Sequence, residues 1–153
     1  MSAEERLKQL GIKLPSPAPP NGAYVEAVQT GNLLFLSGML PVDESGATFI
    51  GRIGAELDIE AGRRAARLAA LNALAAARLQ LGSVDRVSRI VRLGVSVVTV
   101  GDVRDQTVIA DAALAVLEDI FGEDKRPCRL VRGVASLPLG VPVELELIFE
   151  LFG

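Results

Sequence analysis

The chain has 153 residues, half of them hydrophobic, which fits a single globular domain with a sizeable core. Sixteen Lys and Arg residues against nineteen Asp and Glu residues give a net charge of −3, which disfavours a nucleic-acid scaffold, because such proteins need a concentrated positive surface. The sequence contains no histidine, which excludes Ser-His-Asp and Cys-His nucleophile systems and the usual zinc sites.

The start of the chain and its cysteine content indicate a cytoplasmic protein. Residues 2–6 are charged where a secretory signal would need an apolar core, and no apolar run is long enough to span a bilayer. The single cysteine, Cys128, excludes an internal disulfide and agrees with a reducing compartment. We therefore expect a cytoplasmic location and no membrane partner.

The first 22 residues predict a helix followed by an extended connector. Ser2 and Glu5 have the spacing of a capping box, and Gly11 predicts the end of the helix. Four prolines follow between Lys13 and Gly22, and they prevent this stretch from being helical. We expect one domain over residues 1–153, with residues 1–22 as its N-terminal helix and Pro-rich connector.

The next elements predict a hairpin and a long helix. Residues 24–28 and 33–37 are rich in strand formers and flank a turn-like break at 29–32, which predicts a β-hairpin. Asp58 then caps an alanine-rich helix that runs to about Leu81. The small side chains of this helix permit close packing on a sheet.

The second half of the chain alternates strands and a helix. The predicted elements are a strand over 87–100, a helix over 102–121, and strands over 128–134 and 143–152. The resulting order predicts an α+β fold in which two helices cover one face of a mixed sheet. The other face must then be buried against copies of the same chain, which indicates an oligomer.

Three motifs in this sequence resemble the RidA/YjgF family. They are Gly31-Asn32 with Leu36-Ser37-Gly38 and Leu40-Pro41, then Arg129 placed eight residues before Leu137-Pro138, and finally Val143-Glu144-Leu145-Glu146. Their joint order and spacing carry the resemblance, which spans nearly the whole chain. The opening Glu4-Glu5-Arg6-Leu7 and residues 135–140 further resemble a less characterised branch of the family.

The resemblance implies a homotrimer of chorismate-mutase-like fold with ligand clefts between subunits. It also implies cofactor-free hydrolysis of reactive 2-imino acids or enamines to 2-oxo acids and ammonia, so we expect no metal and no organic cofactor. The side chains suit this chemistry. A guanidinium presents paired donors to a carboxylate, and an electrophilic iminium carbon needs only a positioned water with modest general-base help.

By position in the family motifs, Arg129 would clamp the substrate carboxylate and Glu144 would hold or activate the attacking water. The residues that would line the cleft are Tyr24, Ser37, Gly38 and the backbone of Val131. Ordinary structural roles compete with these assignments, because strand arginines are often salt-bridged and strand glutamates often face solvent.

Some positions depart from the family and leave the substrate open. Leu130 follows the arginine where a small residue is typical, Met39 stands where glutamine is common, and Leu114 or Asp111 replaces an asparagine of the second helix. The alternative function is a non-catalytic trimer that binds a carboxylate metabolite as a sensor or partner protein. Ribonuclease activity, attached to the family by name, is disfavoured by the missing histidine, the net charge and the few aromatics.

Overall fold

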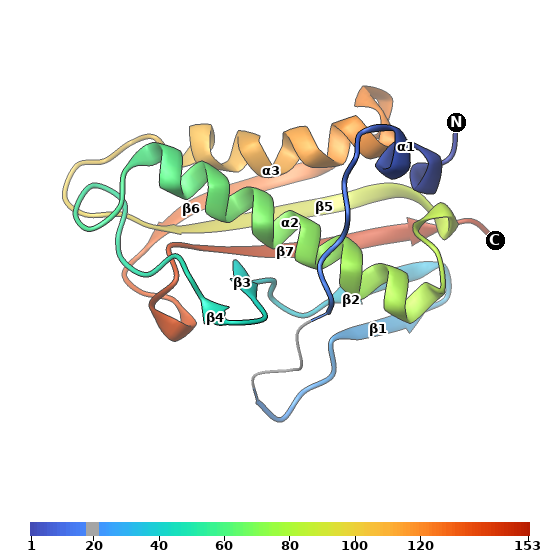
Figure 1. Cartoon of the computed structure of the whole chain (residues 1–153), viewed down its shortest axis with the longest axis horizontal. Coiled ribbons are helices and arrows are strands. Elements are labelled where there is room, and N and C mark those ends of the chain that lie inside the picture. The colour runs from blue at the N-terminus through green and yellow to red at the C-terminus, as the bar shows by residue number, and fades with distance from the viewer. Residues whose placement is uncertain (18–21) are drawn as a thin grey trace.

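The protein is built around a mixed sheet, seen in a computed structural model that describes residues 1–17 and 22–153 (Figure 1). The strands of this sheet are β1 (Ala27–Thr30), β2 (Leu33–Leu36), β5 (Val87–Val98), β6 (Cys128–Val134) and β7 (Val143–Leu151). Their order is β1-β2-β7-β5-β6, so β1 and β6 are the edge strands. β5 and β6 run parallel, and the other neighbours are antiparallel.

Helices cover one face of the sheet (Figure 1). They are α2 (Ile59–Leu81) and α3 (Gln106–Phe121). The Asp58 side chain accepts a hydrogen bond from the Ala61 N–H at the start of α2, and the helix ends at Gly82, in a left-handed conformation. A Cβ atom at Gly62 would lie 2.7 Å from Ile109 Cδ1, so glycine lets α2 and α3 approach closely. This layered α+β arrangement confirms the predicted fold.

The two faces of the sheet differ in chemistry. On β7, the odd-numbered residues from Val143 to Leu151 are buried towards the helices, while the even-numbered positions are the more exposed ones. No helix covers this second face, the open face, in the described part of the chain. Phe35 on β2 pairs with Ile148 and is 39% exposed, and Leu130 on β6 is 42% exposed. Large apolar side chains therefore remain accessible on the open face.

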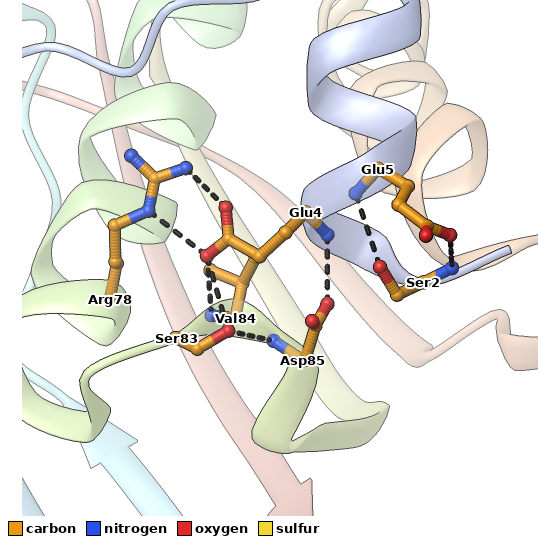
Figure 2. A network of polar contacts seen from close by, with 7 residues as sticks. All are labelled: Ser2, Glu4, Glu5, Arg78, Ser83, Val84 and Asp85. Carbon is orange, nitrogen blue, oxygen red and sulfur yellow. Dashed lines mark hydrogen bonds and ion pairs between the residues drawn. The ribbon is translucent and has the colours of Figure 1, made fainter.

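Helix α1 (Ala3–Gln9) has the predicted capping box between Ser2 and Glu5 (Figure 2). Glu4 fastens this helix to the end of α2: its carboxylate accepts hydrogen bonds from both Arg78 Nη2, at 2.6 Å, and Arg78 Nε, at 3.1 Å. The same carboxylate accepts the Val84 N–H at 3.0 Å. Burial alone raises the pKa of Glu4, but the hydrogen bonds and the charge of Arg78 outweigh burial, so the pKa lies below its ordinary value.

The connector after α1 crosses α2 (Figure 1) and contributes Leu14 to the core. Two of its prolines, Pro15 and Pro17, lie in non-helical backbone as predicted. The other two, Pro19 and Pro20, lie outside the described residues. Among the described residues, no helix is long and apolar enough to cross a membrane.

Four predicted boundaries are wrong by two residues or more. The first strand covers Ala27–Thr30 instead of 24–28; outside it, the Val25 carbonyl accepts a hydrogen bond from the Ser37 hydroxyl at 2.6 Å. The second long helix begins at Gln106 instead of 102, since the Asp102 carboxylate binds Arg104 and does not cap a helix. The third strand ends at Val98, two residues early.

A small hairpin was not predicted. It consists of β3 (Val42–Asp43) and β4 (Gly46–Ala47), which form a separate two-stranded sheet. The Asp43 carboxylate accepts the N–H and hydroxyl of Ser45 and shapes the turn between the two strands. Its strands are too short to produce a periodic sequence pattern.

Candidate functional site

A cleft of about 310 Å³ lies where β2 ends and β7 begins. Among the residues that line it are four of those predicted from sequence: Tyr24, Ser37, Gly38 and Glu144. The backbones of Met39 and Leu145 exchange two hydrogen bonds, at 2.8 and 2.9 Å, and this pairing brings the segment after β2 against the start of β7. The cleft is therefore fixed by main-chain contacts.

Gly38 is required for the position of Glu144. A Cβ atom at Gly38 would lie 2.5 Å from Glu144 Oε2 and 2.9 Å from its Cδ, which is closer than such atoms approach in proteins. Any larger residue would push the carboxylate out of its place. Glycine thus permits the close approach of the Glu144 carboxylate to the main chain.

The environment of Glu144 changes its acidity. Burial raises the pKa of this half-buried carboxyl group, and the negative charge of Glu146 on the same face raises it further. A carboxyl group with a raised pKa exchanges protons more readily near neutral pH than an ordinary glutamate. Glu144 is therefore suited to general acid–base work.

Arg129 lies on the opposite face of the sheet from Glu144. The register of β6 on β5 pairs Arg129 with Leu93, which is buried towards the helices, whereas β7 pairs Glu144 with Ser96 on the open face. Arg129 Nη1 lies 2.6 Å from Asp111 Oδ1 on α3, and the arginine side chain is 27% exposed. Val131 lies two residues along the same edge strand. One chain therefore does not bring the predicted clamp to the predicted base.

Arg132 is a basic residue that the structure places on the side of Glu144, and sequence reasoning missed it. It pairs with Ser96, donates from Nε to Ser96 Oγ at 3.3 Å, and lines a hollow of about 420 Å³ with Glu144 and Glu146. Among the described residues, no carboxylate lies within ion-pair distance of it. Strand alternation could have found it, because positions three apart on a strand face opposite sides.

Comparisons with known proteins agree with this architecture. The family model described as "YjgF/chorismate_mutase-like, putative endoribonuclease" matches residues 4–151. Protein TCP17 of Trypanosoma cruzi is 39% identical over 95% of this chain and 91% of its own length. The crystal structure of Atu1372 from Agrobacterium tumefaciens, a protein of unknown function, is 34% identical with a TM-score of 0.88, covering 98% of this chain and 92% of the other.

A more distant structure shares the fold. Escherichia coli TdcF, solved with bound serine, is 24% identical with a TM-score of 0.61, covering 92% of this chain and 96% of the other. The family match spans almost the whole sequence, and TCP17 and Atu1372 are more similar to this chain in sequence than TdcF is. The chain therefore belongs to the RidA/YjgF family, in the less characterised branch that includes these two proteins.

Proposed function

We propose that the protein hydrolyses reactive 2-imino acids, or their enamine tautomers, to 2-oxo acids and ammonia without a cofactor. The observation that carries this proposal is the placement of Glu144, a half-buried carboxyl group with a raised pKa that lines a cleft beside Gly38. A carboxyl group with a raised pKa can accept a proton from water in one step and donate it in the next, because both of its protonation states are accessible. The removal of damaging intermediates of amino-acid metabolism is the corresponding cellular role.

The proposed site forms between subunits of a homotrimer. Arg129 and Glu144 occupy opposite faces of one sheet, so the two can meet only if different copies supply them. β6 is an edge strand, and its Arg129 and Val131 can be presented to the Tyr24, Ser37, Gly38 and Glu144 cleft of a neighbouring copy. Burial of Phe35 and Leu130 on the open face would favour such assembly.

The chemistry requires three steps. The guanidinium of Arg129 binds the substrate carboxylate through two parallel hydrogen bonds and turns the iminium carbon towards the water. Glu144 accepts a proton from that water as its oxygen bonds to the carbon, which gives a carbinolamine. Glu144 then returns the proton to the nitrogen, and the carbon–nitrogen bond breaks as the hydroxyl proton passes to Glu144. Ammonia and the 2-oxo acid are released, and Glu144 gives this last proton to solvent. The serine bound to TdcF supports a ligand of amino-acid size in this fold.

A coupled assay tests the proposal. A pyridoxal-phosphate-dependent dehydratase generates 2-iminopropanoate or 2-iminobutanoate, and the rate of 2-oxo acid formation is compared with and without the protein. Wild type should exceed spontaneous hydrolysis, and Glu144→Gln should retain 2-oxo acid binding while losing about 10²- to 10⁴-fold in rate, because the amide keeps the shape but not the basicity. Binding without any acceleration by wild type would instead establish the carboxylate-binding trimer.

A further inference from the structure

A second hollow, the side pocket, opens from the Glu144 cleft. It has a volume of about 300 Å³ and shares Tyr24, Gly38 and Leu40 with the cleft. From there it runs under the β3–β4 hairpin to α2, where Asn72 and Ala76 line it. The side chain of a ligand whose reacting carbon lies beside Glu144 can therefore reach this pocket.

We propose that the side pocket binds the substrate side chain and selects uncharged, apolar side chains larger than a methyl group. This inference rests on the proposed function, because it takes the ligand of the Glu144 cleft to be a 2-imino or 2-oxo acid. The pocket volume of about 300 Å³ is at the lower end of small-molecule sites and leaves room for an apolar side chain well above the size of a methyl group.

The walls of the side pocket are largely apolar. Met39 and Ala76 are 5% and 7% exposed and contribute apolar surface, and Leu40 and Leu139 complete the lining nearest the cleft. The thioether of methionine adapts to ligands of differing shape. Burying a branched aliphatic group here would remove apolar surface of both ligand and protein from water.

The charges around the side pocket oppose a second carboxylate. Glu26, Asp43 and Glu44 line it, and no lysine or arginine does so among the described residues. Asp43 is held by Ser45, whereas the Glu26 carboxylate has no hydrogen bond or ion pair within residues 1–17 and 22–153. A side chain ending in a carboxylate would therefore meet uncompensated negative charge.

Asn72 keeps the pocket formed in the free protein. This residue is 7% exposed, and its Nδ2 donates to the carbonyl oxygens of both Leu40 and Val42 at 2.8 Å. The two bonds tie the strand-to-hairpin segment to α2. The wall of the pocket is thus held by a buried amide nitrogen that donates two hydrogen bonds.

Leu139 occupies a strained position at the pocket rim. Its φ is +61°, and it is the one non-glycine residue with positive φ among those described. It is also 52% exposed, so neither backbone preference nor burial explains a leucine there. A strained side chain at a ligand site is a recognised sign of function, and here it places an isobutyl group beside the incoming substrate.

Isothermal titration with three 2-oxo acids tests the inference without requiring turnover. Wild type should bind 4-methyl-2-oxopentanoate at least about 10-fold more tightly than 2-oxopropanoate, which lacks the branched chain, and should bind 2-oxoglutarate more weakly than either. Leu139→Lys keeps a non-glycine residue at the same φ but adds a cation. It should erase the preference for 4-methyl-2-oxopentanoate and strengthen 2-oxoglutarate binding by about 10-fold.

Two further variants test whether the effect of Leu139→Lys arises in the side pocket. Ile50→Lys adds the same charge at a 58% exposed apolar residue that lies beside Gly140 but does not line the side pocket, and it should leave the ranking unchanged. Ala76→Met fills the pocket from α2 and should weaken 4-methyl-2-oxopentanoate binding without affecting 2-oxopropanoate. Each variant is first checked for the wild-type oligomeric mass.

The outcomes separate the two proposals. Similar affinities of wild type for all three acids, or an unchanged ranking in Leu139→Lys, would overturn the side-pocket inference even if imines are hydrolysed rapidly. The expected ranking without any acceleration of imine hydrolysis would support the pocket and refute the proposed reaction alone.

Discussion

Two arginines of one strand lie on opposite faces of the sheet, and each could bind the substrate carboxylate. Arg129 and Arg132 both belong to β6, but Arg129 faces the helices and pairs with Asp111, while Arg132 faces the open side with Ser96 in the hollow that Glu144 also lines. The family resemblance selects Arg129 as the carboxylate clamp, whereas the geometry of a single chain offers Arg132. The family resemblance and the geometry agree with one mechanism only if Arg129 acts on the cleft of another copy. The choice between the two arginines therefore depends on whether the protein forms an oligomer.

Substituting the two arginines separately gives the largest expected difference. Arg129→Ala should lower kcat/KM for 2-iminobutanoate by roughly 10²- to 10⁴-fold, because each charge-assisted bond to the carboxylate contributes about 1.5–3 kcal/mol. Arg129→Lys should fail nearly as badly, since a point charge does not fix the orientation of the imine. Both variants should keep the trimer. A coupled assay measures kcat/KM of each variant, and light scattering measures its oligomeric mass.

Arg132→Ala is the matched control for that experiment, because it removes the same side chain from the same strand. We expect a change of less than about threefold in kcat/KM. If Arg132→Ala is inactive and Arg129→Ala is active, the site lies on the open face of one chain, and the transfer of roles by family motif is wrong.

The open face can be altered without touching either arginine. Phe35→Asp places a charge among the exposed apolar residues of that face and should dissociate the proposed trimer at micromolar concentration, with loss of the proposed shared cleft and activity. Val108→Asp, at a 38% exposed position on α3, is the control and should remain trimeric. Light scattering that shows wild type itself as a stable monomer would remove the intersubunit site.

The pH dependence of activity tests whether Glu144, on the open face, is the catalytic base. Because burial and the charge of Glu146 raise the pKa of Glu144, activity that needs the carboxylate should fall with decreasing pH earlier than for an ordinary glutamate. Glu146→Gln removes the second cause, so the acidic limb of kcat/KM should move to lower pH. Glu150→Gln, farther along β7, should leave the limb in place. An unmoved limb in Glu146→Gln would mean that Glu144 does not govern the rate.

The smallest expected effect concerns an ion pair with a structural role. Glu4 bonds Arg78 twice and also the Val84 N–H, whereas Arg129 makes a single bond to Asp111. Glu4→Gln should therefore lower the free energy of unfolding by about 1 kcal/mol with little change in kcat/KM, as denaturant titration and the coupled assay would show. Glu60→Gln, in an exposed pair with Arg63 at 3.8 Å, should change neither.

This contribution of Glu4 depends on pH in a defined direction. The folded pKa of Glu4 is lowered, so its stabilisation is fully present above the ordinary glutamate value of 4.5 and is lost as the pH falls through the folded pKa. The difference in stability between wild type and Glu4→Gln should shrink over that acidic range. A constant difference would contradict the assigned charge-assisted contacts.

The sequence by itself determined those elements whose limits are set by local chemistry. Ser2 and Asp58 cap α1 and α2 as predicted, Gly82 ends α2, and the bounds of β6 match the predicted 128–134. Caps and glycine stops act within one helical turn, so they are legible without knowledge of the fold. The missed start of β1 and the β3–β4 hairpin depend instead on partners brought by other segments.

The candidate site also combines features that the sequence determines with features that only the tertiary structure decides. Motif order identified Tyr24, Ser37, Gly38 and Glu144, and the structure places them around one cleft. Alternation along β6 and β7 follows from the sequence, because side chains on a strand change sides at each residue. Which side faces the helices is decided by the register of both strands on β5, formed between segments far apart in the chain. Only that tertiary pairing separates Arg129 from Glu144 and sets Arg132 on the open face.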